Sequence, residues 1–397
     1  MANIEPGMFQ PDRPLDGRRI AMFSGNYNYI RDGANQALNR LVAHLDSAGA
    51  QVRVYSPTTR TPAFEPAGTL VSVRSFALPG RGEYRLATGL PKRIKDDIRQ
   101  FSPHLVHLSA PDILGTKALG WAKSELRIPV ISSLHTRFET YLGYYGLGML
   151  RRLMDRHLTS FYGRCDYVLV PNRQIQEEMA PIHGDRIKIW GRGVDHSLFS
   201  PQRRSESWRQ QMGYGPEDVI PLFFGRLVLE KGTERFGEII NRLCQLGITT
   251  PPLVVGEGPA RAKLAQLLPQ ARFTGHLTGE ELAVAIASAD VLVNPSQSEA
   301  FGNVNLEAMA SGLAIVAADC PSSRNLIVHG QNGWLCDTEN VELCADEVRA
   351  LVEDPSRRGA LGAAAVETAA HYHWDRILDQ VVEIYCKALD KFKPVAA

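Results

Sequence analysis

Residues 289–311 read ADVLVNPSQSEAFGNVNLEAMAS, and this stretch decides the fold. Its beginning is mostly apolar and predicts a buried parallel strand that ends at Asn294-Pro295. A short polar loop follows, and then a predicted helix. This order places the unpaired backbone N–H groups of a helix N-terminus beside the carboxyl end of a strand, where they attract anions and phosphate most readily.

Two glutamates, Glu299 and Glu307, flank this predicted anion site with seven residues between them. A carboxylate is repelled by phosphate, so each glutamate is predicted to accept hydrogen bonds from hydroxyl groups, one from a sugar and the other from a ribose. The alternative is a surface loop with two solvated glutamates. Glutamate pairs are common on helices, so the pair alone does not decide between the two interpretations.

The composition is that of an ordinary globular protein, with 397 residues, 44% hydrophobic and 22% charged, which is enough for two or three domains. We find no run of about 18 apolar residues that would span a bilayer, and no apolar signal segment at the N-terminus. Six scattered cysteines without a CxxC pair indicate buried thiols in a reducing compartment. We therefore expect a cytoplasmic protein.

Charge is distributed unevenly along the chain. Residues 1–200 hold 26 Lys and Arg against 18 Asp and Glu, whereas the remainder holds 18 against 25. A basic first half indicates that one domain faces an anionic partner. Membrane phospholipid is the candidate we favour over nucleic acid, which we do not expect. A solvated surface without a partner is the alternative.

Both halves show the alternation of strands and helices that is typical of Rossmann-like domains. The fingerprint GxGxxG is absent, which argues against a dinucleotide dehydrogenase. We predict a first domain over residues 1–195, a linker over 196–218 and a second domain over 219–375. A terminal helix over 376–397 is expected to pack back on the first domain.

Three cationic or titratable residues follow predicted strands, at the sheet edge where open α/β folds bind ligands. Arg226 and Lys231 follow the strand 219–224, and together they suit a diphosphate, because arginine offers a fork and lysine a point charge. His135 follows the strand 129–134. A structural role is its alternative, and His107, inside another predicted strand, is interpreted as a core or loop-edge histidine and not as a catalyst.

These motifs together resemble retaining glycosyltransferases of family 4, which have the GT-B fold of two facing Rossmann-like domains with a cleft between them. The resemblance rests on Glu-x7-Glu with Phe301-Gly302 inside it and on GRL-x3-KG from Gly225 to Gly232. It implies transfer of a hexose or hexuronic acid from a nucleotide-diphosphate sugar. The catalytic residues that it implies are His135, Glu299, Arg226 and Lys231. The donor-binding residues that it implies are Gly33, Gly256, Gly275, Ala300, Phe301, Gly302 and Glu307. A plain turn glycine is the alternative for Gly33, and Arg192 is added as a donor-binding residue because it suits an acidic sugar.

The segment HTRFETYLGYYG, from His135 to Gly146, resembles sulfolipid synthases and lipid mannosyl- and glucuronosyltransferases. Its continuation, Tyr141–Leu153, combines aromatic, glycine and basic residues and suits a lipid headgroup interface, with an aromatic core helix as the alternative. We favour a UDP-sugar donor and a lipid acceptor such as diacylglycerol or ceramide, on the inner face of the cytoplasmic membrane. GDP-mannose, a soluble or polysaccharide acceptor, a sugar-nucleotide epimerase and a non-catalytic sensor remain alternatives.

No Asp-x-Asp sequence occurs, so no metal and no cofactor besides the donor is implied. Arg226, Lys231 and the helix dipole are expected to neutralise the leaving diphosphate instead. The segment after His135 offers no carboxylate at the position of a double-displacement nucleophile, although Glu139 is close in sequence. We therefore predict front-face attack, with the leaving diphosphate as the base.

Overall fold

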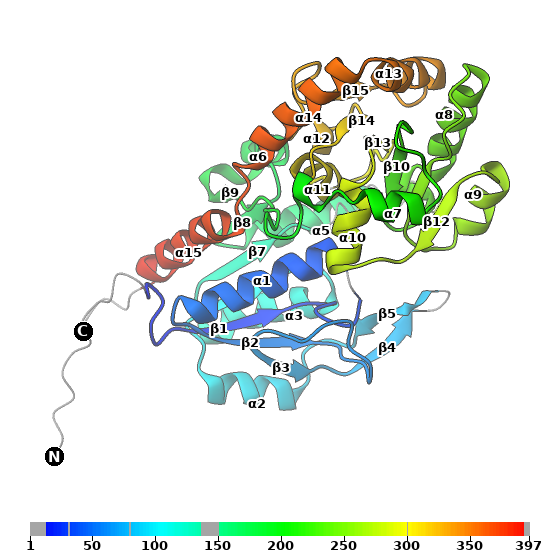
Figure 1. Ribbon diagram of the computed structural model, residues 1–397. Coiled ribbons are helices and arrows are strands. Elements are labelled where there is room, and N and C mark those ends of the chain that lie inside the picture. Colours follow the sequence, from blue (N-terminus) through cyan, green and yellow to red (C-terminus); the bar gives the residue numbers. More distant parts are fainter. Residues whose placement is uncertain (1–12, 31, 79–80, 136–150, 300, 393–397) are drawn as a thin grey trace. The chain divides into compact units, whose positions relative to one another are not determined.

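The computed structural model describes residues 13–30, 32–78, 81–135, 151–299 and 301–392 (Figure 1). The chain divides into two compact units. The first contains Met1–Gly191 and Asp375–Ala397, and the second contains Arg192–Trp374. The terminal segment that was expected to return to the first domain is thus grouped with it, and residues 196–218 are grouped with the second unit.

A parallel sheet of seven strands, in the order β3-β2-β1-β6-β7-β8-β9, forms the first unit. Its strands are β1 (Arg19–Phe23), β2 (Gln51–Ser56), β3 (Thr69–Ser72), β6 (Leu105–Leu108), β7 (Val130–Ser133), β8 (Tyr167–Val170) and β9 (Ile187–Ile189). A separate antiparallel hairpin consists of β4 (Ser75–Leu78) and β5 (Arg81–Ala87). The helices are α1 (Gly33–Ser47), α2 (Lys92–Phe101), α3 (Ile113–Trp121), α5 (Arg151–Gly163), α6 (Arg173–His183) and α15 (Trp374–Lys391).

Local sequence explains where the first helix begins and which face it buries. The carboxylate of Asp32 caps α1 by accepting a hydrogen bond from the backbone N–H of Asn35. Apolar residues at helical spacing then form the buried stripe, as the sequence predicted. These residues are Ala37, Leu38, Leu41, Val42 and Leu45.

The second unit contains a parallel sheet of six strands in the order β12-β11-β10-β13-β14-β15. Its strands are β10 (Pro221–Phe224), β11 (Leu253–Val255), β12 (Arg272–Gly275), β13 (Val291–Asn294), β14 (Ala314–Ala318) and β15 (Trp334–Cys336). Its helices are α7 (Glu206–Gln211), α8 (Thr233–Gln245), α9 (Arg261–Leu267), α10 (Gly279–Ala287), α11 (Asn303–Ala310), α12 (Pro321–Arg324), α13 (Val341–Glu353) and α14 (Pro355–Ala369).

The central strands of this sheet are buried on both faces, which is why they appear as continuous apolar runs in the sequence. Along β10, Leu222 and Phe224 belong to one hydrophobic cluster and Phe223 belongs to another. Along β13, Leu292 belongs to the first cluster and Val293 to the second. Successive side chains of a strand point to opposite faces, so the two clusters lie on opposite sides of the sheet.

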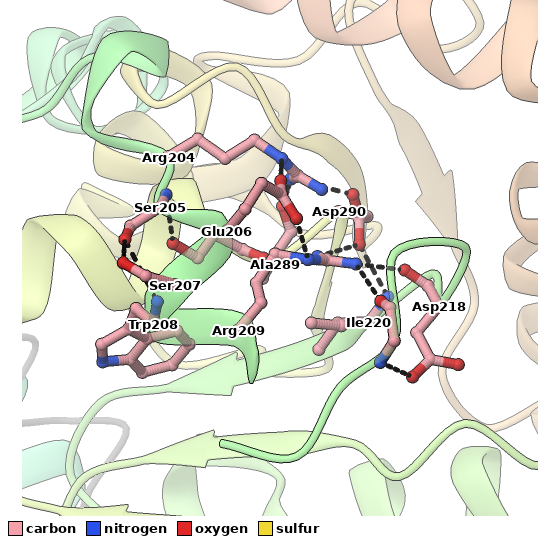
Figure 2. A network of polar contacts seen from close by, with 12 residues as sticks. Arg204, Ser205, Glu206, Ser207, Trp208, Arg209, Asp218, Ile220, Ala289 and Asp290 are labelled. Carbon is pink, nitrogen blue, oxygen red and sulfur yellow. Dashed lines mark hydrogen bonds and ion pairs between the residues drawn. The ribbon is translucent and has the colours of Figure 1, made fainter. Parts of the chain in front are cut away.

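A buried arginine holds α7 to the amino ends of these strands (Figure 2). The Arg209 side chain is 1% exposed, and its guanidinium donates to the carbonyl oxygens of Ser288 at 2.7 Å and Asp218 at 2.6 Å. It also pairs with the Asp290 carboxylate at 3.1 Å, which in turn accepts from the backbone N–H of Ile220 at 2.8 Å. These partners of the two terminal nitrogens offset the cost of burying the charge. The network therefore joins the expected linker to the starts of β10 and β13.

Two parallel Rossmann-like sheets with helices around them confirm the predicted fold class. None of the helices in the described part of the chain is both long and apolar enough to cross a membrane.

Candidate functional site

The stretch that decides the fold adopts the predicted order of strand, loop and helix. Strand β13 ends at Asn294, and Gly302 forms the N-cap of α11 with φ 98° and ψ 45°, a left-handed conformation suited to glycine. No side chain of the described residues caps this helix. The N–H groups of its first turn therefore remain available for an anion, because they have no partner within the helix.

Lys231 and Glu299, which the sequence assigned from two separate motifs, lie in direct contact. The Nζ atom of Lys231 is 2.8 Å from Oε1 of Glu299, and the two side chains are 29% and 10% exposed. Lys231 ends the 3-10 turn Leu229–Lys231, which follows β10. The Ser298 hydroxyl donates to the Glu230 carbonyl oxygen at 2.9 Å and holds the two loops together. The site thus joins a cation suited to phosphate with a carboxylate suited to a hydroxyl group.

A buried chain of side-chain hydrogen bonds joins the end of β13 to α11. The sequence did not predict it. The Asn294 side chain donates from Nδ2 to Oδ1 of Asn305 at 2.7 Å, and Asn305 donates in turn to the Ser323 hydroxyl at 3.3 Å. Oδ1 of Asn294 accepts from the backbone N–H of Ser296 at 3.2 Å. Buried amides need such partners. Their signal in the sequence is polar residues at the end of an apolar strand and in the first turn of the following helix.

Glycines at the ends of β10, β11 and β12 let three backbones approach closely. Gly256 has φ 142°, and a Cβ atom there would lie 1.9 Å from the carbonyl oxygen of Gly225. The N–H of Gly256 donates to the carbonyl oxygen of Gly275 at 2.8 Å. Arg226 follows Gly225, and its side chain is exposed. The predicted glycines and Arg226 therefore lie at the carboxyl ends of adjacent strands.

The remaining predicted residues of the second unit lie in different surroundings. Glu307 lies on α11 and is half-buried. The Phe301 ring is 5% exposed and packs in the core, edge-on to Tyr372 at 6.1 Å, so its ring belongs to the packing of the unit. Arg192 is 4% exposed, and burial lowers the pKa of its guanidinium to about 10, which leaves it charged at neutral pH. Ala300 lies outside the described residues.

In the first unit, His135 follows the end of β7. Its Nε2 atom is 2.8 Å from the Ser133 hydroxyl, and its ring is edge-on to Trp190 at 5.1 Å. Gly33 is the first residue of α1. His107 is fully buried, which confirms its interpretation as a core histidine. Most of Tyr141–Leu153 lies outside the described residues, and α5 begins at Arg151.

Both halves of the chain match profiles of known protein families. The profile described as "Glycosyltransferase Family 4" matches residues 31–198, and the profile "Glycosyl transferases group 1" matches residues 204–368. A sulfoquinovosyl transferase of Arabidopsis thaliana, SQD2, is 31% identical over 384 residues, which are 94% of this chain and 74% of that protein. The chain belongs to glycosyltransferase family 4.

Two further proteins are similar to this glycosyltransferase, one in sequence and the other in structure. A GDP-mannose-dependent alpha-mannosyltransferase of Mycolicibacterium smegmatis is 31% identical over 374 residues, covering 92% of this chain and 96% of that one. The structure of Anabaena HepE with UDP-glucose matches with a TM-score of 0.70 and 19% identity, over 93% of this chain and 99% of that one. The structural match shows the GT-B fold.

Proposed function

We propose that this glycosyltransferase moves a hexose or hexuronic acid from a UDP-sugar to the hydroxyl group of a membrane lipid such as diacylglycerol or ceramide. The contact between Lys231 and Glu299, beside the first turn of α11, carries the proposal. Phosphate oxygens would accept hydrogen bonds from that turn, and Lys231 and Arg226 would neutralise their charge. Glu299 would accept a hydrogen bond from a hydroxyl group of the sugar, and Glu307 would accept one from a hydroxyl group of the ribose.

In the proposed reaction the anomeric carbon keeps its configuration. The bond between this carbon and the diphosphate oxygen breaks while the acceptor oxygen bonds to the same face. The proton of the acceptor hydroxyl passes to the leaving diphosphate, so no external base is needed. Arg226, Lys231 and the α11 dipole stabilise the charge that develops on the leaving group, and the proposed reaction needs no metal. His135 is proposed to bind a hydroxyl of the donor sugar.

The donor and the acceptor have separate support. The resemblance of the segment from His135 to Gly146 to sulfolipid synthases favours a UDP-sugar and a lipid, and the basic first half of the chain suits an anionic membrane surface. The second candidate donor is GDP-mannose, because the similar Mycolicibacterium smegmatis protein is a GDP-mannose-dependent enzyme. A thermal-shift screen against UDP-, GDP- and ADP-sugars distinguishes these donors, since a bound ligand stabilises the folded state.

Replacing Glu299 by alanine tests the site. We expect Glu299→Ala to lower kcat by at least about 100-fold, the usual effect of losing one preorganised transition-state contact. Lys231→Ala should raise the donor KM and lower kcat. Glu234→Ala is the matched control, because Glu234 pairs with Lys263 on the exposed surface of the same unit. The measurement is release of nucleoside diphosphate with and without anionic lipid vesicles. Wild-type turnover by Glu299→Ala would refute the assignment of the site. Turnover that is the same with and without lipid vesicles would refute a lipid acceptor.

A further inference from the structure

A continuous chain of hydrogen bonds runs through the interior of the first unit and ends at His135. The hydroxyl of Tyr385, on α15, is 2.5 Å from Nδ1 of His107 on β6. Nε2 of His107 is 2.9 Å from the Ser133 hydroxyl on β7. The same hydroxyl is 2.8 Å from Nε2 of His135. Tyr385, His107 and Ser133 are all fully buried, so water does not compete for the two bonds among them, whereas His135 is half-buried.

The protonation states within the chain follow from burial. Burial lowers the pKa of His107 to about 3, so its imidazole is neutral at physiological pH. A neutral imidazole has one nitrogen that donates and one that accepts. Burial also raises the pKa of Tyr385, which therefore keeps its phenolic hydrogen. The hydrogens available to these bonds are therefore one on the Tyr385 hydroxyl, one on the Ser133 hydroxyl and one on the His107 ring.

The Tyr385 hydroxyl sets the direction of these hydrogen bonds. Among the described residues, His107 is the one hydrogen-bond partner of this hydroxyl. A hydrogen on Nδ1 of His107 would leave the phenolic hydrogen buried without an acceptor, which is costly. Tyr385 therefore donates to Nδ1, and His107 donates from Nε2 to the Ser133 oxygen. The Ser133 hydrogen then points to Nε2 of His135.

We propose that Tyr385, His107 and Ser133 are positioning residues that hold His135 as the tautomer with its proton on Nδ1. The edge-on contact with Trp190 at 5.1 Å fixes the plane of the His135 ring as well. In this arrangement Nδ1–H is the donor that His135 offers to a hydroxyl of the sugar, a role that rests on the proposed function. A residue of the C-terminal helix, 278 positions away from His107, thereby governs a group of the candidate site.

The tautomer of His135 is directly measurable by long-range ¹⁵N–¹H correlation of the imidazole groups, with the signals assigned through His135→Gln. In the wild type we expect the hydrogen on Nδ1 and the unprotonated nitrogen at Nε2. In Tyr385→Phe the donor-to-acceptor direction of these hydrogen bonds is no longer set, so the tautomer of His135 with its hydrogen on Nε2 should appear. Tyr55→Phe is the matched control, because it removes a buried hydroxyl of the same unit that bonds Asp97 and lies outside the chain.

Ser133→Ala removes the bond to His135 itself and serves as the second variant if Tyr385→Phe folds poorly. It should shift the His135 tautomer in the same direction as Tyr385→Phe. A wild-type His135 with its hydrogen on Nε2 would overturn the proposal. An unchanged tautomer in either folded variant would overturn it as well, because a purely structural role of the chain predicts lower stability with the same tautomer.

Kinetics separate this proposal from the proposed function. Tyr385→Phe and Ser133→Ala should lower kcat by about 10- to 100-fold, by analogy with removal of a group that orients a metal-ligating imidazole. The donor KM should stay within about twofold, because the donor's phosphate contacts are unchanged. Full activity of His135→Gln would refute the catalytic role of His135, whereas the tautomer measurement would still decide whether the chain positions its ring.

Discussion

At the residue scale, burial decides which groups of this protein can change charge. His107 is enclosed completely, and its pKa lies near 3 in the folded protein, whereas an unfolded histidine titrates near 6.5. As the pH falls below about 6.5, the unfolded chain binds a proton that the folded chain does not bind. The contribution of His107 to the free energy of unfolding is therefore greatest above about pH 6.5. It is lost progressively as the pH falls to about 3.

His107→Gln removes this titration and should flatten the pH dependence of stability. Between pH 6.5 and pH 5 the wild type should lose about 1.5 kcal/mol more unfolding free energy than the variant loses. Urea denaturation followed by tryptophan fluorescence at several pH values measures the difference. His371→Gln, at an exposed position, should keep the wild-type slope. Equal slopes for His107→Gln and the wild type would show that the pKa of His107 does not differ between the folded and unfolded states.

At the scale of elements, the loops after the strands of the second unit depend on backbone contacts as much as on side chains. Local apolar runs predicted β10 and β13, and the order of strand, polar loop and following sequence predicted α11. The close approach of Gly256 to Gly225 and the amide chain through Asn294 and Asn305 were not predictable in this way, since each joins elements that are distant in sequence.

Gly256→Ala should disrupt the junction between β10 and β11. The added Cβ atom would lie 1.9 Å from the Gly225 carbonyl oxygen, so the strand ends must move apart. Gly247→Ala is a matched control, because Gly247 also has a positive φ, of 91°, but its Cβ atom would meet no atom within 4 Å. We expect about 1–2 kcal/mol of destabilisation for Gly247→Ala from backbone strain.

Gly256→Ala should cost at least about 2 kcal/mol more than Gly247→Ala, because steric overlap adds to the strain. Thermal unfolding with and without the nucleotide sugar measures both variants. Donor affinity should also fall for Gly256→Ala and stay unchanged for Gly247→Ala. Equal stability of the two variants would mean that the Gly225 backbone moves away from the added Cβ atom without lowering the free energy of unfolding.

At the scale of the whole molecule, the first unit is built from discontinuous sequence, because α15 is grouped with it although this helix follows the second unit along the chain. This helix contributes a buried apolar face and the Tyr385 hydroxyl to the first unit. The buried residues are Leu378, Val381, Val382, Ile384, Tyr385 and Ala388. Burial of each large apolar side chain stabilises by about 1.5–3 kcal/mol, so their sum is comparable with the stability of a typical domain.

A chain that ends before Asp375 should therefore lose the first unit selectively. Hydrogen–deuterium exchange resolved by peptide is the measurement. Peptides from β6 and β7 should exchange rapidly in the truncated chain, whereas peptides from β13 and β14 should keep their wild-type protection and serve as the internal control. Unchanged protection of β6 and β7 would show that the first unit folds without α15.

The sequence by itself determined the alternation of strands and helices, the family resemblance and the two motifs that contain Lys231 and Glu299, because periodicity, turn residues and motif spacing are local properties of the chain. Only the tertiary structure decided that Lys231 and Glu299 touch, that Phe301 packs in the core and that Tyr385 reaches His135 through His107 and Ser133. These contacts join residues from different elements, and they form only when the sheets bring distant segments together.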